Sequence, residues 1–134
     1  MYYDFHTDAA IMNMGGHNPV RTDISCTIFL QDPDSYGGGE LTVEGPEGRH
    51  QVKLPAGHAA LYNTSDLHRV EVVTEGARLA AVFWIQSHVR EAAHRAVLMR
   101  LNDLCRRHAD NGLAKADHNL ASRTVHDLLR MWAA

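Results

Sequence analysis

Features that would point to several specialised protein classes are scarce in this sequence. It has only two cysteines, Cys26 and Cys105, and their wide separation rules out a C-x-x-C motif, so we expect two reduced thiols in a cytoplasmic protein. No apolar run approaches the roughly 20 residues that span a bilayer, and the first residues lack the basic and apolar regions of a signal peptide. A formal net charge of −3 offers no electrostatic basis for binding nucleic acid. We therefore expect neither a nucleic-acid nor a membrane partner.

Histidine is the residue type that stands out. The chain has 134 residues and 45% of them are hydrophobic, which allows one domain with a modest core. It has ten histidines. This number raises the chance of a metal site and also the chance that a short metal-binding motif arises by accident.

Short segments rich in β-branched and aromatic residues, separated by turn-forming sequences, occupy the first two thirds of the chain. The predicted strands are 22–32, 40–45, 49–54, 58–63, 68–73 and 77–86. We interpret DPDSYGGG (32–39) as a turn, and we predict that the last two strands form a hairpin around 74–76, with Gly76 in the left-handed conformation. Strands this short favour an antiparallel sandwich or barrel.

The last third has the spacing of two helices. Apolar residues recur at three- and four-residue steps from about 89 to 108 and again from about 114 to 132. We predict a mainly β (α+β) chain with a β core at 1–87 and a helical region at 88–134 packed on it. A jelly roll usually has about eight strands. Because fewer are predicted here, we expect the core to be incomplete at its N-terminus.

The first candidate site is the H-x-D motif at His6 and Asp8. In an extended segment, residues two apart emerge on the same face, so one strand can supply two adjacent ligands of an octahedral metal. One further histidine would complete a 2-His-1-carboxylate site with open positions. The motif alone is weak, because His108 and Asp110 form a second copy at the end of a predicted helix. We interpret that second copy as a solvated helix end.

His68 and Arg78 give the first motif its support. His68 begins a predicted strand in which Arg69 and Glu71 alternate with it, so His68 faces inward, as a metal ligand or as an ordinary core histidine. A three-residue hairpin loop would pair Val72 with Arg78 and place Arg78 on the His68 face, whereas a two-residue loop would leave it on the surface. An inward arginine is costly unless it meets an anion. No acidic neighbour is predicted there, so the anion would be a ligand carboxylate.

These residues resemble the Fe(II)/2-oxoglutarate-dependent dioxygenases, and more specifically the bacterial PKHD-type hydroxylases, a prolyl-4-hydroxylase-like group associated with iron uptake. The resemblance extends over nearly the whole chain, in the segments 2–12, 21–41, 52–70, 76–90 and 118–133. It implies a double-stranded β-helix (a cupin-like jelly roll) followed by helices, with His6, Asp8 and His68 as catalytic iron ligands. It also implies that Arg78 binds the distal carboxylate of 2-oxoglutarate. Members of the family carry a long segment before the H-x-D strand, so we expect this chain to be N-terminally truncated.

The resemblance also implies an activity. The expected enzyme is a dioxygenase that uses Fe(II), O₂ and 2-oxoglutarate to hydroxylate an unidentified small-molecule or protein substrate, releasing succinate and CO₂, with ascorbate as a candidate reductant. Tyr3 and Tyr62 are candidate co-substrate or pocket contacts, and Val70, Val82 and Trp84 would exclude water.

Two alternatives remain open. One is a non-catalytic metal-binding β-sandwich module left by N-terminal truncation. The other is a cupin-like enzyme such as an isomerase, which would have no need of an arginine at position 78. Exposed edge strands of an incomplete barrel would favour a homo-oligomer in either case.

Overall fold

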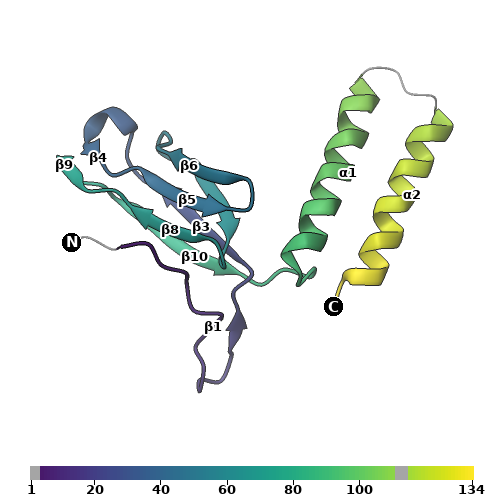
Figure 1. Cartoon of the computed structure of the whole chain (residues 1–134), viewed down its shortest axis with the longest axis horizontal. Helices are drawn as coiled ribbons and strands as arrows, with labels where there is room; N and C mark the ends of the chain where they lie inside the picture. The colour runs from purple at the N-terminus through teal and green to yellow at the C-terminus, as the bar shows by residue number, and fades with distance from the viewer. Residues whose placement is uncertain (1–3, 111–114) are drawn as a thin grey trace. The chain divides into compact units, whose positions relative to one another are not determined.

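The computed structural model describes residues 4–110 and 115–134 (Figure 1). The chain divides into two compact units, Met1–Gln86 and Ser87–Ala134, and each is described by itself. The first unit consists of short strands with one 3₁₀ turn at Pro33–Ser35. Its strands are β1 (Ile11–Met12), β2 (Val20–Arg21), β3 (Ile24–Phe29), β4 (Gly37–Gly38), β5 (Leu41–Gly45), β6 (Gly48–Val52), β7 (Ala59–Asn63), β8 (Leu67–Val70), β9 (Val73–Glu75) and β10 (Ala80–Ile85).

Two antiparallel sheets enclose the core of this unit. One has the strand order β10-β3-β7 and the other β6-β5-β8. Phe29 of β3 and Leu41 and Val43 of β5 are buried in one cluster, because alternate residues of each strand face the opposite sheet. Partly buried side chains packed against this cluster come from both sheets and the loop after β6: Val52, Leu54, Ala60, Tyr62 and Val70. The predicted antiparallel β core of the jelly-roll type is therefore confirmed.

The predicted hairpin between residues 68–73 and 77–86 is wrong. β8 pairs with β5, and β10 pairs with β3, so the two segments belong to different sheets. Between them, β9 pairs with β4, and the chain passes from one sheet to the other. Gly76 does have a positive φ of 69°, but for another reason. A Cβ at that position would lie 2.7 Å from the carbonyl oxygen of Ser35, so the close approach of that segment requires glycine.

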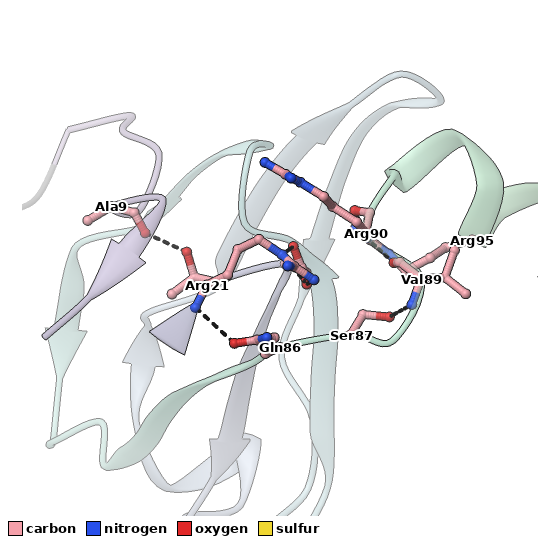
Figure 2. A network of polar contacts seen from close by, with 9 residues as sticks. Ala9, Arg21, Gln86, Ser87, Val89, Arg90 and Arg95 are labelled. Carbon is pink, nitrogen blue, oxygen red and sulfur yellow. Dashed lines mark hydrogen bonds and ion pairs between the residues drawn. The ribbon is translucent and has the colours of Figure 1, made fainter. Parts of the chain in front are cut away.

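Polar contacts attach the segment that contains β1 and β2 to the sheet of order β10-β3-β7. The backbone N–H of Arg21 donates to Oε1 of Gln86 across 3.1 Å, and the hydroxyl of Thr22 donates to the carbonyl of Ala9 across 2.5 Å (Figure 2). The Arg21 side chain also pairs with Asp23 across 2.9 Å. These contacts fix the chain directly after Asp8, which matters for the site described below.

The second unit contains the helices α1 (Ala92–Asp110) and α2 (Lys115–Trp132), as the periodicity predicted. Neither of these helices, as far as they are described, is long and apolar enough to cross a membrane. The ring of His94 stacks on that of Trp132, with centroids 4.2 Å apart and planes 9° apart. Near the start of α1, the guanidinium of Arg95 donates to the carbonyls of Val89 and Arg90 (Figure 2). The start of this unit and the end of α2 are thereby held together.

Candidate metal centre

His6 and His68 face each other across one antiparallel bridge. The N–H of His6 donates to the carbonyl of His68 across 3.1 Å, and the N–H of His68 donates back to the carbonyl of His6 across 2.9 Å. Side chains of such a pair lie on the same face of the two segments. Their imidazole rings accordingly have centroids only 4.5 Å apart. The segment of the H-x-D motif pairs with β8 only through this single bridge, which is enough to bring both histidines together.

Asp8 completes the cluster. Its Oδ1 lies 3.9 Å from Nε2 of His6, and its Oδ2 lies 3.6 Å from Nε2 of His68. One potential ligand atom from each of the three residues lies within 4.8 Å of the others, and among the described residues this is the only such group. The side chains of His108 and Asp110, the second H-x-D copy, lie outside those that the structure describes.

Backbone carbonyls set the tautomer of both histidines. Nδ1 of His6 lies 2.9 Å from the carbonyl oxygen of Asp4, and Nδ1 of His68 lies 3.0 Å from that of Asp66. A carbonyl oxygen can only accept, so we assign the proton to Nδ1 in each ring. Each Nε2 then presents a lone pair towards Asp8. Two imidazoles oriented in this way are typical metal ligands.

One oxygen of Asp8 is fixed by donors from two strands. Oδ2 accepts a hydrogen bond from Oγ of Ser25 (2.8 Å) and one from Nε1 of Trp84 (2.9 Å). Ser25 is fully buried, and its Oγ also lies 3.1 Å from Oγ1 of Thr64. Oδ1 is left to bind a metal. Sequence reasoning missed Ser25 and treated Trp84 only as an apolar wall; a serine within a strand of mostly β-branched and apolar residues was the available signal.

The inward side chains of β3 connect this cluster to Arg78. Ser25, Thr27 and Phe29 are alternate residues of one strand, and all three are buried. Ser25 contacts Asp8, Thr27 hydrogen-bonds the side chain of Tyr62, and Phe29 carries the guanidinium of Arg78 with Cζ 5.4 Å from its ring centroid. Along β3, the inward side chains therefore contact Asp8, Tyr62 and Arg78 in that order.

Tyr62 is neutral in this environment. Burial raises the pKa of its phenol, and the negative charge of Asp8 raises that pKa further, while the hydrogen bond with Thr27 and the charge of Arg78 oppose the shift. The ring of Tyr62 lies 4.9 Å from that of His68. Tyr62 is therefore a neighbour of the metal cluster and within electrostatic reach of Arg78. Tyr3, the other tyrosine considered from the sequence, lies outside the described residues.

Arg78 is held inward even though the predicted hairpin does not form. Its Nε and Nη2 are buried and have no hydrogen-bond partner among the described residues. A cation in this state indicates a place for an anion. The wall expected from Val82 is open, because 51% of that residue is exposed although it pairs with buried Thr27.

The cluster therefore fits a divalent metal of the kind that nitrogen and oxygen ligands hold. It offers two imidazole nitrogens and one carboxylate oxygen, each oriented by a contact on its other polar atom. Their spacing requires only a small adjustment for all three to reach one cation. Such a site would keep open positions for other ligands.

Comparison with known proteins agrees with this chemistry. The profile of the 2OG-Fe(II) oxygenase superfamily matches residues 1–86, which is the extent of the β unit. The chain is 45% identical over 139 residues to a PKHD-type hydroxylase of Xylella fastidiosa (strain 9a5c). It is 46% identical over 134 residues to PKHD-type hydroxylases of Xanthomonas euvesicatoria pv. vesicatoria (strain 85-10) and Polaromonas sp. (strain JS666 / ATCC BAA-500). Each alignment covers 98% of this chain and 59% of the relative.

The chain thus spans about 59% of the length of these curated relatives. The family match and the cluster of His6, Asp8 and His68 fall in the same unit. This chain belongs to the 2OG-Fe(II) oxygenase superfamily.

Proposed function

We propose that the protein is an Fe(II)- and 2-oxoglutarate-dependent dioxygenase that hydroxylates a substrate still to be identified, with release of succinate and CO₂. The observation that carries this proposal is a candidate metal-ligating cluster connected by one strand, β3, to an arginine whose buried Nε and Nη2 have no hydrogen-bond partner among the described residues. A metal site alone would suit many reactions. The additional arginine favours an anionic co-substrate.

In this proposal, His6 and His68 would bind Fe(II) through Nε2, and Asp8 would bind it through Oδ1. The iron, when bound, supplies the activation of O₂ that hydroxylation requires. The protein orients the ligands: carbonyls hold both Nδ1–H groups, and Ser25 and Trp84 hold the other carboxylate oxygen. Ascorbate would serve as a reductant that keeps the iron in the ferrous state.

Arg78 would hold the distal carboxylate of 2-oxoglutarate. Its buried Nε and Nη2 are donors in need of an acceptor, and a guanidinium can bind a carboxylate through two parallel hydrogen bonds. The ring of Tyr62 would line the space between the iron and this arginine. It contacts the ring of His68, and its phenol interacts electrostatically with both Asp8 and Arg78. A neutral phenol suits that place because a second negative charge would repel the dianionic co-substrate.

A non-catalytic metal-binding module is the second candidate, and one observation favours it. His6 has 44% of its side chain exposed and Val82 is 51% exposed, so one side of the site is open to water in this chain. Water reaching the iron would favour unproductive reactions over hydroxylation. Both candidates bind metal, and they differ in turnover.

Succinate formation separates them. The chain would be incubated aerobically with Fe(II), 2-oxoglutarate and ascorbate, and succinate would be quantified by mass spectrometry. We expect formation that requires all the components and is lost in Asp8→Ala. Iron binding without succinate above the level of Asp8→Ala would support the non-catalytic module instead.

A further inference from the structure

Arg78 is not alone in carrying buried donors without a partner. Within the part of the chain that the structure describes, the buried side-chain polar atoms that lack a hydrogen bond are Nε and Nη2 of Arg78 and the hydroxyl of Tyr36. Tyr36 is only 5% exposed. A buried hydroxyl without a partner costs free energy, so its retention calls for an explanation.

The two side chains are neighbours at Gly39. A Cβ at this glycine would lie 3.0 Å from Cδ of Arg78 and 3.0 Å from Cε2 of Tyr36, so these two atoms are at most about 6 Å apart. Gly39 has a φ of 71°, and the absence of a side chain there leaves room for both. The hydroxyl of Tyr62 differs, because the side chain of Tyr62 already has a hydrogen bond with Thr27.

Tyr36 is positioned without the help of its hydroxyl. Nζ of Lys53 donates to the carbonyl of Tyr36 across 2.7 Å and lies 4.3 Å from the centre of its ring. Gly76 approaches the other end of the residue, since a Cβ there would lie 3.3 Å from Cα and Cβ of Tyr36. The fold therefore determines where the ring lies, and the hydroxyl remains free for another purpose.

We propose that Tyr36 is a positioning residue for 2-oxoglutarate: its hydroxyl donates a second hydrogen bond to the distal carboxylate that Arg78 holds. This inference rests on the proposed function. The two side chains approach each other at Cδ of Arg78 and Cε2 of Tyr36. Both the guanidinium and the phenol donate, and one carboxylate with two oxygens can accept from both. The additional donor would favour a co-substrate with a carboxylate at its far end over one with a neutral group there.

The test is Tyr36→Phe, which removes one oxygen and keeps the ring. Manganese(II)-loaded protein would be titrated with 2-oxoglutarate by calorimetry, and manganese(II) affinity would be measured separately. We expect the Kd for 2-oxoglutarate to rise about 10–100-fold, as for loss of a hydrogen bond to a charged group, with manganese(II) affinity unchanged. Ser35→Ala is the matched control: it removes the exposed hydroxyl of the residue just before Tyr36, which donates to the carbonyl of Asp32, and should leave both affinities unchanged.

Thermal unfolding without 2-oxoglutarate distinguishes a binding role from a structural one. Removing an unpartnered buried hydroxyl should leave the melting temperature of the ligand-free protein equal or higher, while the increase produced by 2-oxoglutarate becomes smaller. The inference is wrong if Tyr36→Phe binds 2-oxoglutarate as tightly as the original chain, or if it lowers the ligand-free melting temperature and the manganese(II) affinity together. If the original chain does not bind 2-oxoglutarate, or if Arg78→Ala binds it as tightly as the original chain does, the proposed function is wrong, and this inference is wrong with it.

Discussion

The indole Nε1 of Trp84 donates a hydrogen bond to Oδ2 of Asp8 across 2.9 Å, although the two residues are 76 positions apart in the chain. Together with the hydroxyl of Ser25, this donor occupies one carboxylate oxygen and leaves Oδ1 for a metal. Strands β3 and β10 of one sheet thereby orient a candidate ligand that lies outside that sheet.

Removing the hydroxyl of Ser25 should weaken metal binding. In Ser25→Ala, Oδ2 of Asp8 keeps only the indole donor, so the carboxylate is less firmly oriented. We expect about 10–100-fold weaker manganese(II) binding, which is typical when a contact that supports a metal ligand is lost. Calorimetric titration measures it, with Ser87→Ala as the control because that serine lies in the helical unit. Equal affinity in Ser25→Ala and the original chain would show that Ser25 does not orient Asp8.

Trp84 should report metal binding by its fluorescence. The chain has two tryptophans, so Trp132→Phe leaves Trp84 as the only indole. We expect cobalt(II), an open-shell ion, to quench this emission and to saturate at one equivalent. The double variant with His68→Ala should show no saturable quenching. If quenching persists in that double variant, the cobalt(II) is bound elsewhere.

Gly39→Ala should weaken 2-oxoglutarate binding. The new methyl group would press on Cδ of Arg78 and on the ring of Tyr36, each 3.0 Å away. Backbone strain at a φ of 71° adds a stability cost of about 1–2 kcal/mol. Gly57→Ala is the matched control, because its φ is 82° and a Cβ there meets nothing within 4 Å.

In urea unfolding, Gly57→Ala should lose only the stability that backbone strain costs, and Gly39→Ala should lose that and more because its methyl group is overpacked. Only Gly39→Ala should lose affinity for 2-oxoglutarate, by about 10-fold or more. Equal affinities for the two variants would contradict the placement of Arg78 and Tyr36 in the co-substrate site.

Glu71 should contribute to acid sensitivity. Its carboxylate accepts hydrogen bonds from Oγ1 of buried Thr42 (2.6 Å) and Nε of Arg69 (2.9 Å), and these bonds lower its pKa below 4.5. A lowered folded-state pKa gives stability that is present above the unfolded value and is lost as the pH falls through the folded one. We expect Glu71→Gln to flatten the loss of unfolding free energy below about pH 4.5, measured by urea unfolding at several pH values. Glu44→Gln, which removes an exposed ion pair with Arg49, should retain the original acid profile.

Arg69 links the Glu71 carboxylate to the segment that precedes His6. The guanidinium of Arg69 stacks on the ring of Phe5, with Cζ 4.4 Å from its centroid, and Phe5 directly precedes His6. An acid profile of Glu71→Gln identical to the original would show that these contacts add nothing to the pH dependence.

Local patterns in the sequence were sufficient to predict most elements of this fold. Alternation and turn residues placed β3, β5, β6, β7 and β10, and the three- and four-residue spacing placed both helices. The pairing of strands was harder, because it depends on contacts between distant segments. The turn Thr74-Glu75-Gly76 looked like a hairpin locally, but β9 instead pairs with Gly37–Gly38, a two-residue strand without the composition of a strand.

In the candidate site, too, residues in local motifs could be predicted, and residues that contact the site from distant segments could not. The sequence motif and the resemblance supplied His6, Asp8, His68 and Arg78, and the structure brings the first three together. Ser25, Trp84 and Tyr36 could not be assigned from the sequence, since each acts through a residue far away along the chain. Tyr36 lies in a segment that looks like a simple turn, and only its burial and missing partner single it out.

The decisive measurement is an anaerobic titration of the chain with Fe(II) and 2-oxoglutarate, followed by visible absorption. We expect a weak charge-transfer band that saturates at one iron per chain, is absent in His68→Ala and requires a higher concentration of 2-oxoglutarate in Arg78→Ala. An iron-bound chain with no such band, or a band that survives in His68→Ala, would show that His6, Asp8 and His68 do not form the proposed iron and 2-oxoglutarate site.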